Sequence, residues 1–312
     1  MITNEWMRMM NLKRDGNAIV GGLVALCVLL ALYLNTASSE SALGLVLPRE
    51  RAVSAMRYLP VYSYLGTAET NEVFLMDTTH GAEGYVAVTA KSEEPVKIRL
   101  IAPGGLERVY NVPHTGLVSY YPLSDGRGTY GIQLLKKADE SEGENMYVQV
   151  LQGSCEAMLF DEFQPFLRPS SYVWFTGYSD CVAEAARICS GQSSDDRKIE
   201  RIKDYICDNL SYDELLAESE DQSFIRDPDA ILSRKSGTCL DYSVLAAAML
   251  RSQGIPTKVV YGEMNGAQGL HAWNMVYTSS RGWFRLDLSS QDNGIAESYV
   301  ADERNYTDSG WY

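Results

Sequence analysis

Residues 236–250 read Ser236-Gly237-Thr238-Cys239-Leu240-Asp241-Tyr242-Ser243-Val244-Leu245-Ala246-Ala247-Ala248-Met249-Leu250, and they decide the C-terminal half of the chain. Gly237 permits a tight turn, and Thr238 or Ser236 can cap a helix that begins near Cys239. Alanine and leucine sustain this helix until Gly254 ends it. Cys239 is thereby predicted at a helix N-terminus, where free N–H groups and the helix dipole favour a thiolate and could help to hold an oxyanion.

A cysteine at the head of an apolar helix is, on its own, more often a small core residue than a nucleophile. A base is therefore needed, and His271 is the only histidine after residue 114. It opens a predicted strand over 271–277, and a turn at 279–282 leads to a second strand over 283–287. Folding this hairpin brings Asp287 within about two residues of His271. A carboxylate there can fix the tautomer of the imidazole and stabilise its charged form.

The three residues together predict a catalytic triad, with Cys239 as nucleophile, His271 as base and Asp287 as orienter. Each of them has an ordinary structural interpretation when taken singly. Asp241 and Asn274 lie close to these positions, but a first-turn carboxylate and a polar strand residue need no catalytic role.

This pattern resembles the core of the transglutaminase-like superfamily, whose members are similar to papain-type cysteine enzymes. The resemblance covers about residues 195–290 and includes Gly237-Thr238-Cys239, Gly254-Ile255-Pro256, His271-Ala272-Trp273, and Gly282-Trp283 followed by Asp287. The separations, 271 − 239 = 32 and 287 − 271 = 16, are similar to those of the family. The resemblance implies an α+β core and thioester chemistry. The family normally adds a second oxyanion donor from a side chain before the cysteine, and Tyr212 stands near that place without being assigned to the site.

The resemblance implies that the thiolate of Cys239 attacks an amide carbonyl and that His271 protonates the leaving amine. We expect a cysteine hydrolase acting on peptide or isopeptide bonds, with a protein or peptide substrate that could be at the cell surface. One alternative is transglutaminase-type acyl transfer to amines, which shares the first half-reaction. The other is a non-catalytic surface scaffold or binding protein. The residues do not identify the substrate or the oligomeric state.

The rest of the chain predicts further elements around this core. Asp180 could cap a short helix that ends before Gly191, Ser194 a longer one, and Asp227-Pro228 opens another, whereas 212–227 is acidic and typical of a loop. Residues 71–165 are predicted to form an all-β, sandwich-like domain, because short alternating runs are separated by turn residues. Its predicted strands lie at 72–77, 84–90, 96–100, 106–112, 116–121, 130–134 and 146–150. The catalytic domain is expected over 170–312.

Residues 18–34 form an uncharged apolar run preceded by Lys13 and Arg14. At 1.5 Å per residue the run spans about 25 Å, just enough for a bilayer core. Basic residues before the run keep that side in the cytoplasm. We therefore expect a cytoplasmic segment at 1–17, a single transmembrane anchor, a linker over 35–70, and an extracytoplasmic catalytic domain, as in bacterial members of the family. A cleaved signal peptide, which would make the protein secreted, is the alternative.

Composition and cysteine spacing limit the classes of partner and cofactor that we expect. The net charge is −14, from 27 Lys+Arg and 41 Asp+Glu, without a basic cluster, so no nucleic-acid partner is expected. No Cys-x-x-Cys pair is present and histidine occurs only three times, so neither a metal nor another cofactor is expected. Besides Cys27 and Cys239, four cysteines could form disulfides in an oxidising compartment, but spacing alone does not pair them. They are Cys155, Cys181, Cys189 and Cys207.

Overall fold

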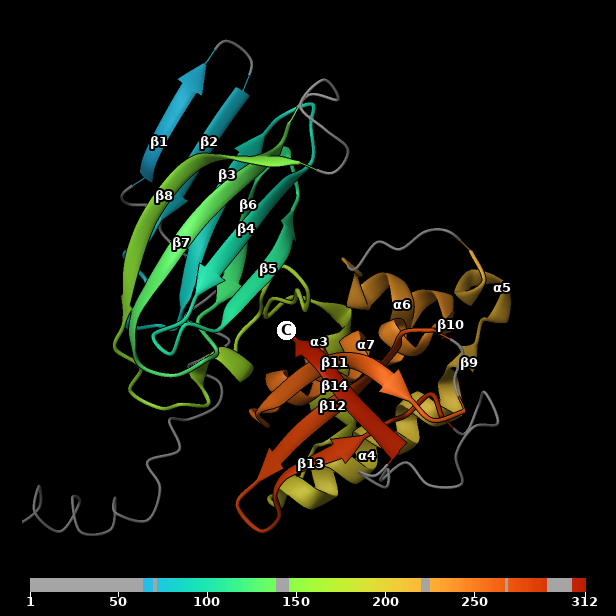
Figure 1. Ribbon diagram of the computed structural model, residues 1–312. Helices are drawn as coiled ribbons and strands as arrows, with labels where there is room; N and C mark the ends of the chain where they lie inside the picture. Colours follow the sequence, from blue (N-terminus) through green and yellow to red (C-terminus); the bar gives the residue numbers. More distant parts are fainter. Residues whose placement is uncertain (1–63, 70–71, 139–145, 220–224, 267–268, 291–304) are drawn as a thin grey trace, which may run out of the picture. The chain divides into compact units, whose positions relative to one another are not determined.

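The computed structural model describes residues 64–69, 72–138, 146–219, 225–266, 269–290 and 305–312. The expected anchor at 18–34 and the cytoplasmic segment at 1–17 lie outside these residues. Within the described ranges, no helix combines the length and the apolar character needed to cross a bilayer. The fold is mixed α and β, with a β-rich N-terminal region followed by a core of helices and an antiparallel sheet (Figure 1).

Two four-stranded antiparallel sheets make up the β-rich region. One has the order β1-β2-β3-β6 and consists of β1 (Tyr64–Glu69), β2 (Glu72–Asp77), β3 (Tyr85–Lys91) and β6 (Thr115–Pro122). The other has the order β5-β4-β7-β8 and consists of β5 (Glu107–Val112), β4 (Val96–Ile101), β7 (Gly128–Lys137) and β8 (Tyr147–Ala157).

Alternating side chains explain why these segments become strands with one buried face. In β4 the side chains of Val96, Ile98 and Leu100 are buried, while Lys97 and Arg99 between them are partly exposed. The seven predicted strands are all present, with ends shifted by a few residues in the longer ones. The linker expected at 35–70 contains the strand β1, which pairs with β2 from Tyr64 opposite Asp77 to Glu69 opposite Glu72. The sequence of β1 does not alternate apolar and polar residues, so it lacks the pattern that identifies its neighbours.

The helical layer begins after the β-rich region. Its elements are the 3-10 turn η2 (Gln164–Phe166) and the helices α3 (Asp180–Ile188), α4 (Asp195–Asn209), α5 (Glu214–Ala217), α6 (Pro228–Arg234) and α7 (Cys239–Ser252). Ser194, Asp227 and Thr238 are the N-cap residues of α4, α6 and α7. The cap of α3 is Ser179, and Asp180 is instead the first residue inside the helix. The stretch 212–227, expected as a loop, contains the single turn α5, for which Asp213 is the N-cap.

The C-terminal sheet is antiparallel and has the order β13-β12-β11-β14. Its strands are β11 (Thr257–Met264), β12 (His271–Thr278), β13 (Gly282–Leu286) and β14 (Tyr306–Trp311). The hairpin of β12 and β13 turns between Thr278 and Gly282, whose backbone adopts a positive φ of 70° that glycine tolerates best. Helix α7 packs on β11 and β12, and two short strands, β9 (Ser211–Tyr212) and β10 (Ser236–Gly237), pair in parallel beside its N-terminus.

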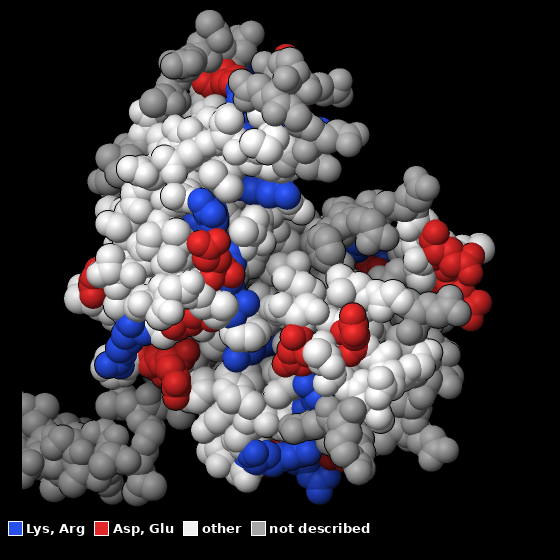
Figure 2. Space-filling model, in the orientation of Figure 1, with Lys and Arg blue, Asp and Glu red and all other residues white. Residues whose placement is uncertain are grey.

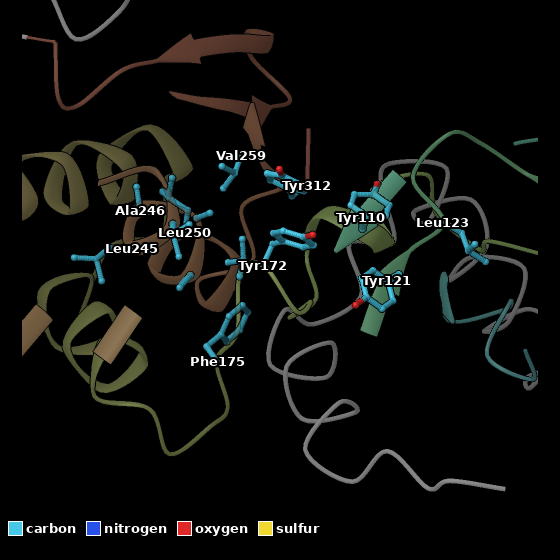
Figure 3. Close-up of a cluster of buried hydrophobic side chains, with 14 of the residues drawn as sticks. Tyr110, Tyr121, Leu123, Tyr172, Phe175, Leu245, Ala246, Leu250, Val259 and Tyr312 are labelled. Atoms are coloured by element: carbon cyan, nitrogen blue, oxygen red, sulfur yellow. The ribbon is translucent and has the colours of Figure 1, made fainter. Parts of the chain in front are cut away.

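Buried side chains from the β-rich region and from the C-terminal core belong to one hydrophobic cluster (Figure 3). Tyr172 stacks on Tyr312 with ring centroids 4.1 Å apart, and Tyr110 lies 5.9 Å from Tyr312. Arg251 of α7 is 1 % exposed, and its guanidinium donates to the main-chain oxygens of Thr257, Arg168 and Tyr312. Burial lowers the pKa of Arg251 to about 9. Its hydrogen bonds join three chain segments, which stabilises the end of β14 against α7.

Charged side chains are distributed without a dominant sign on the face drawn in Figure 2. Lysine and arginine are interspersed with aspartate and glutamate over the described residues there. Exposed ion pairs also occur among the described residues, such as Arg197 with Glu200 at 2.8 Å. Pairs of this kind contribute little to stability.

Candidate active site

Cys239 is the first residue of α7, and the turn before it is fixed by a capping box. The carboxylate of Asp241 accepts hydrogen bonds from the backbone N–H of Thr238 at 2.8 Å and from its hydroxyl at 3.0 Å. A Cβ on Gly237 would lie 2.4 Å from Cβ of Asp241, so only glycine fits at this position. The local sequence therefore fixes where Cys239, which is half-buried, presents its thiol.

Two arginines neutralise the carboxylate that holds this turn. Asp241 is fully buried, and its second oxygen lies 3.2 Å from Nη2 of Arg234 and 3.5 Å from Nε of Arg226. A buried carboxylate needs such partners, because an unpaired charge is costly in the interior. The structural role foreseen for Asp241 is therefore present, and it acts on the loop that carries Cys239.

His271 and Asp287 are in contact. Nε2 of His271 lies 2.7 Å from Oδ2 of Asp287, and the two side chains are 4 % and 0 % exposed. The strand register explains the contact: Asn274 pairs with Leu286, so Asp287 follows opposite Trp273, two residues from His271. The hairpin expected from the turn residues thus brings these two predicted site residues together.

The same imidazole also reaches the thiol. Besides its contact with Asp287, His271 forms a side-chain hydrogen bond with Cys239. Burial by itself lowers the pKa of His271, but the hydrogen bonds to Asp287 and Cys239 and the charges of both groups outweigh it and raise the pKa to about 10. A protonated imidazole in this position can stabilise negative charge on the neighbouring sulfur.

Asp287 is held by more than its histidine. Oδ1 accepts hydrogen bonds from the backbone N–H of Ser289 at 3.2 Å and from its hydroxyl at 3.0 Å. Oδ2 accepts a second hydrogen bond, at 2.9 Å, from the hydroxyl of Tyr306. Both oxygens of this buried carboxylate are thus satisfied, and its orientation toward His271 is fixed.

Tyr212 lies beside the cysteine. Parallel pairing of β9 with β10 sets Tyr212 opposite Gly237, two residues before Cys239. The pKa of Tyr212 is raised to about 12, mainly by burial and then by the charge of Cys239, while a hydrogen bond from the backbone of Cys239 lowers it. A hydrogen bond lowers the pKa of a phenol when an N–H donates to the phenol oxygen, so the Cys239 backbone acts as the donor here. The phenol proton is then available to a second acceptor. The sequence placed Tyr212 near this position but offered no distance that would assign it.

Asn274, in contrast, holds the scaffold together. Its amide donates to the main-chain oxygen of Ser243 on α7 at 2.9 Å and to that of Lys258 on β11 at 3.2 Å. It thereby links the helix that carries Cys239 to the sheet that carries His271. This is the structural role expected of it.

The described residues contain neither a cluster of metal ligands nor a disulfide. In the described part of the chain, no group of three or more His, Cys, Asp and Glu side chains is arranged to hold a metal ion. None of the cysteines in that part is in a disulfide, including Cys155, Cys181, Cys189, Cys207 and Cys239. Cys27 lies outside the described residues. The thiol of Cys239 is therefore chemically available beside a base.

Residues 183–288 match the family model described as the Transglutaminase-like superfamily. The chain carries a transglutaminase-like domain. The matched range contains Cys239, His271 and Asp287 and ends before β14. The transglutaminase-like core and the β-rich region before it are the parts of the predicted fold that the structure contains.

Solved structures show weaker likenesses to the chain as a whole. A candidate cysteine protease from Cytophaga hutchinsonii is 16 % identical over 80 % of this chain and 91 % of that chain, with a TM-score of 0.37. The periplasmic domain of TgpA from Pseudomonas aeruginosa is 14 % identical over 75 % and 78 %, with a TM-score of 0.33. Red sea bream transglutaminase is 12 % identical over 67 % and 48 %, with a TM-score of 0.31. No curated protein matches the sequence. The family assignment therefore depends on the match of residues 183–288.

Proposed function

We propose that the protein is an exported cysteine hydrolase that cleaves amide bonds of peptides or proteins through a thioester on Cys239. The observation that carries the proposal is the buried His271 imidazole, which contacts Asp287 at 2.7 Å and is also hydrogen-bonded to the side chain of Cys239. A thiol, a buried base and a carboxylate in this order form the arrangement that activates a nucleophile. The transglutaminase-like domain is consistent with this chemistry.

The proposed reaction has two steps. The thiolate of Cys239 attacks the amide carbon, the C–N bond breaks, and protonated His271 gives its proton to the leaving amine. Neutral His271 then takes a proton from water, whose oxygen attacks the thioester carbon and releases a carboxylic acid and the thiolate, which leaves the thiolate and protonated His271 of the starting state. Asp287 orients the imidazole in both steps and stabilises its charged form.

Tyr212 is proposed as the donor for the oxyanion that forms in each step. Its oxygen accepts a hydrogen bond from the backbone of Cys239, so its own O–H can donate to the oxyanion that forms beside Cys239. Donors that are fixed in advance where negative charge develops lower the barrier to acyl transfer. Parallel pairing with β10 supplies this fixation.

Location is part of the proposal. The apolar run at 18–34, with basic residues before it, supports an anchored protein whose catalytic domain faces away from the cytoplasm. Substrates would then be proteins or peptides outside the cytoplasm. Protease protection of a tagged C-terminus in intact cells tests this: an accessible tag supports export, and a protected tag contradicts it.

Mass spectrometry of reaction products tests the chemistry. The full chain is incubated with a peptide library and a labelled primary amine. Cleaved or deamidated peptides, each of which has gained water across an amide bond, support hydrolysis. Peptides that carry the labelled amine instead support acyl transfer. Cys239→Ala must abolish either product while leaving thermal unfolding unchanged, and Cys207→Ala, at another half-buried cysteine, serves as the matched control. Full activity of Cys239→Ala would contradict the proposal.

A further inference from the structure

The carboxylate oxygen that faces the base has two donors. Oδ2 of Asp287 lies 2.7 Å from Nε2 of His271 and 2.9 Å from the hydroxyl of Tyr306. Tyr306 is the first residue of β14, and it lies beyond residues 183–288, which match the family model. A strand outside the matched range therefore contacts the partner of the base.

The fold brings Tyr306 to this position across the sheet. Tyr306 pairs with Met264 of β11, and its ring packs edge-on against Trp273 of β12, with centroids 4.9 Å apart and an interplanar angle of 72°. A Cβ on Gly262 would lie 2.9 Å from the ring of Trp273 and 2.0 Å from the backbone of Thr307, so glycine keeps β14 and Trp273 close. The phenol is thus held in place by packing as well as by its hydrogen bond.

We propose that Tyr306 is a positioning residue that sets the basicity of His271 through Asp287, an inference that rests on the proposed function. A hydroxyl that donates to a carboxylate stabilises part of the carboxylate's negative charge and weakens its hold on a neighbouring imidazolium. Ser289 binds the other oxygen, so removing the Tyr306 hydroxyl should leave the carboxylate oriented but more strongly basic toward His271.

The groups around Tyr306 keep its hydroxyl protonated, so that it can donate a hydrogen bond. Burial, and then the neighbouring charge of Asp287, raise the pKa of Tyr306 well above its ordinary value. Besides Asp287 and His271, the charged and titratable groups near this cluster among the described residues include Cys239 of α7, Tyr212 of β9, Arg285 of β13 and Asp308 of β14. Arg285 lies over the Tyr306 ring at 4.8 Å and is paired with Asp308 at 2.7 Å. The Arg285 charge is thereby largely balanced within its own pair.

The consequence for catalysis concerns the second step. His271 must lose its proton to act as the base toward water. If Asp287 stabilises the imidazolium too strongly, His271 stays protonated at neutral pH. Because Tyr306 also donates a hydrogen bond to the carboxylate of Asp287, it lowers the pKa of His271 toward the pH at which the enzyme works. Removing the hydroxyl with Tyr306→Phe should raise the pKa of His271 by about one unit, a tenfold change in its protonation equilibrium.

Histidine NMR tests this directly, because the chain has three histidines. The full-length chain, labelled at the histidine rings, is titrated in a Cys239→Ala background so that no thiol titrates alongside, and His271→Gln identifies the resonance. Four proteins are compared in that background: the parent, Tyr306→Phe, Asp287→Asn and the double variant. Tyr277→Phe, on the same strand as His271 with its ring against Phe163 at 4.2 Å, is the matched control.

We expect the titration midpoint of His271 to rise in Tyr306→Phe, to stay unchanged in Tyr277→Phe, and to show no further rise when Tyr306→Phe is added to Asp287→Asn. A midpoint that is unchanged or lowered in Tyr306→Phe overturns the inference, as does an equal rise in the Asp287→Asn background. The proposed function fails separately, if Cys239 in the unaltered chain reacts with iodoacetamide no faster than an ordinary thiol, and that result leaves the NMR comparison intact.

Discussion

The hydroxyl of Tyr212 lies in hydrogen-bond contact with the backbone of Cys239, a contact set by the pairing of Tyr212 with Gly237. It joins two segments that are 27 residues apart in the chain (239 − 212 = 27) at the point where the proposed thioester would form. The contributions of the oxyanion donor and of the nucleophile to the reaction rate can be measured separately, because some reactions of a thiolate generate an oxyanion and others do not.

Tyr212→Phe should slow acylation without affecting alkylation. Release of p-nitrophenol from p-nitrophenyl acetate passes through an oxyanion, and we expect its rate to fall by about 10²–10³-fold, as for the loss of one oxyanion donor elsewhere. Alkylation of Cys239 by iodoacetamide forms no oxyanion and should proceed at the parent rate. Equal losses in both reactions would show that Tyr212 acts on the thiol itself and would contradict the assignment.

The stability of the protein should depend on pH through His271. Its pKa in the folded state, about 10, lies above the ordinary histidine value of 6.5, so the folded state binds the proton more tightly than the unfolded state. The resulting stabilisation is complete below the unfolded value and is lost as pH rises through about 10.

Urea titrations of the parent and His271→Gln at about pH 6 and about pH 9.5 measure this contribution. The free energy of unfolding of the parent should fall relative to that of the variant between the two pH values. A difference that stays constant or grows with pH would show that the imidazole is not held in its charged form by Asp287 and Cys239.

Gly237→Ala should destabilise the turn that carries Cys239. The new Cβ would lie 2.4 Å from Cβ of Asp241, so the capping box must shift, at a cost of about 1–3 kcal/mol. Gly177→Ala is the matched control, since its Cβ would meet nothing within 4 Å and its φ is not positive. Chemical denaturation of both variants checks the difference, and equal stabilities would show that the turn tolerates a side chain.

Arg251→Met should lower the free energy of unfolding by about 3 kcal/mol, because it leaves three buried main-chain oxygens without their donor. Methionine keeps most of the apolar volume, so the loss reports the hydrogen bonds more than packing. Arg197→Met, at a side chain that is 68 % exposed and paired with Glu200, should change stability by less than about 1 kcal/mol. An Arg251→Met protein as stable as the parent would contradict the role given to this guanidinium.

Local sequence patterns predicted much of the site. Thr238 before an apolar, alanine-rich run predicts the start of α7, and the turn residues 279–282 between two alternating runs predict the hairpin that joins His271 to Asp287. These features depend on neighbours within a few residues. Their geometry therefore follows from local preferences. The hairpin places His271 and Asp287, which are 16 residues apart in the chain, in contact.

Features that depend on distant partners were not predictable in this way. Strand β14 is polar and mostly exposed along its middle, and it becomes a strand only by pairing with β11. Tyr306 reaches Asp287 through that pairing, so nothing near it in the sequence identifies it. The one-turn helix α5 and the strand β1 likewise lack a periodic pattern. Tertiary pairing, more than local propensity, determines these elements.

In the proposed function the environment of Cys239 turns an ordinary thiol into a nucleophile, and the alkylation rate of Cys239 tests this most directly. Iodoacetamide is applied to the folded chain at about pH 6, where an ordinary thiol is almost entirely protonated, and mass spectrometry gives the rate at each cysteine. We predict that Cys239 reacts far faster than half-buried Cys207 and that His271→Gln removes this advantage. Equal rates at the two cysteines, unchanged by His271→Gln, would contradict the account.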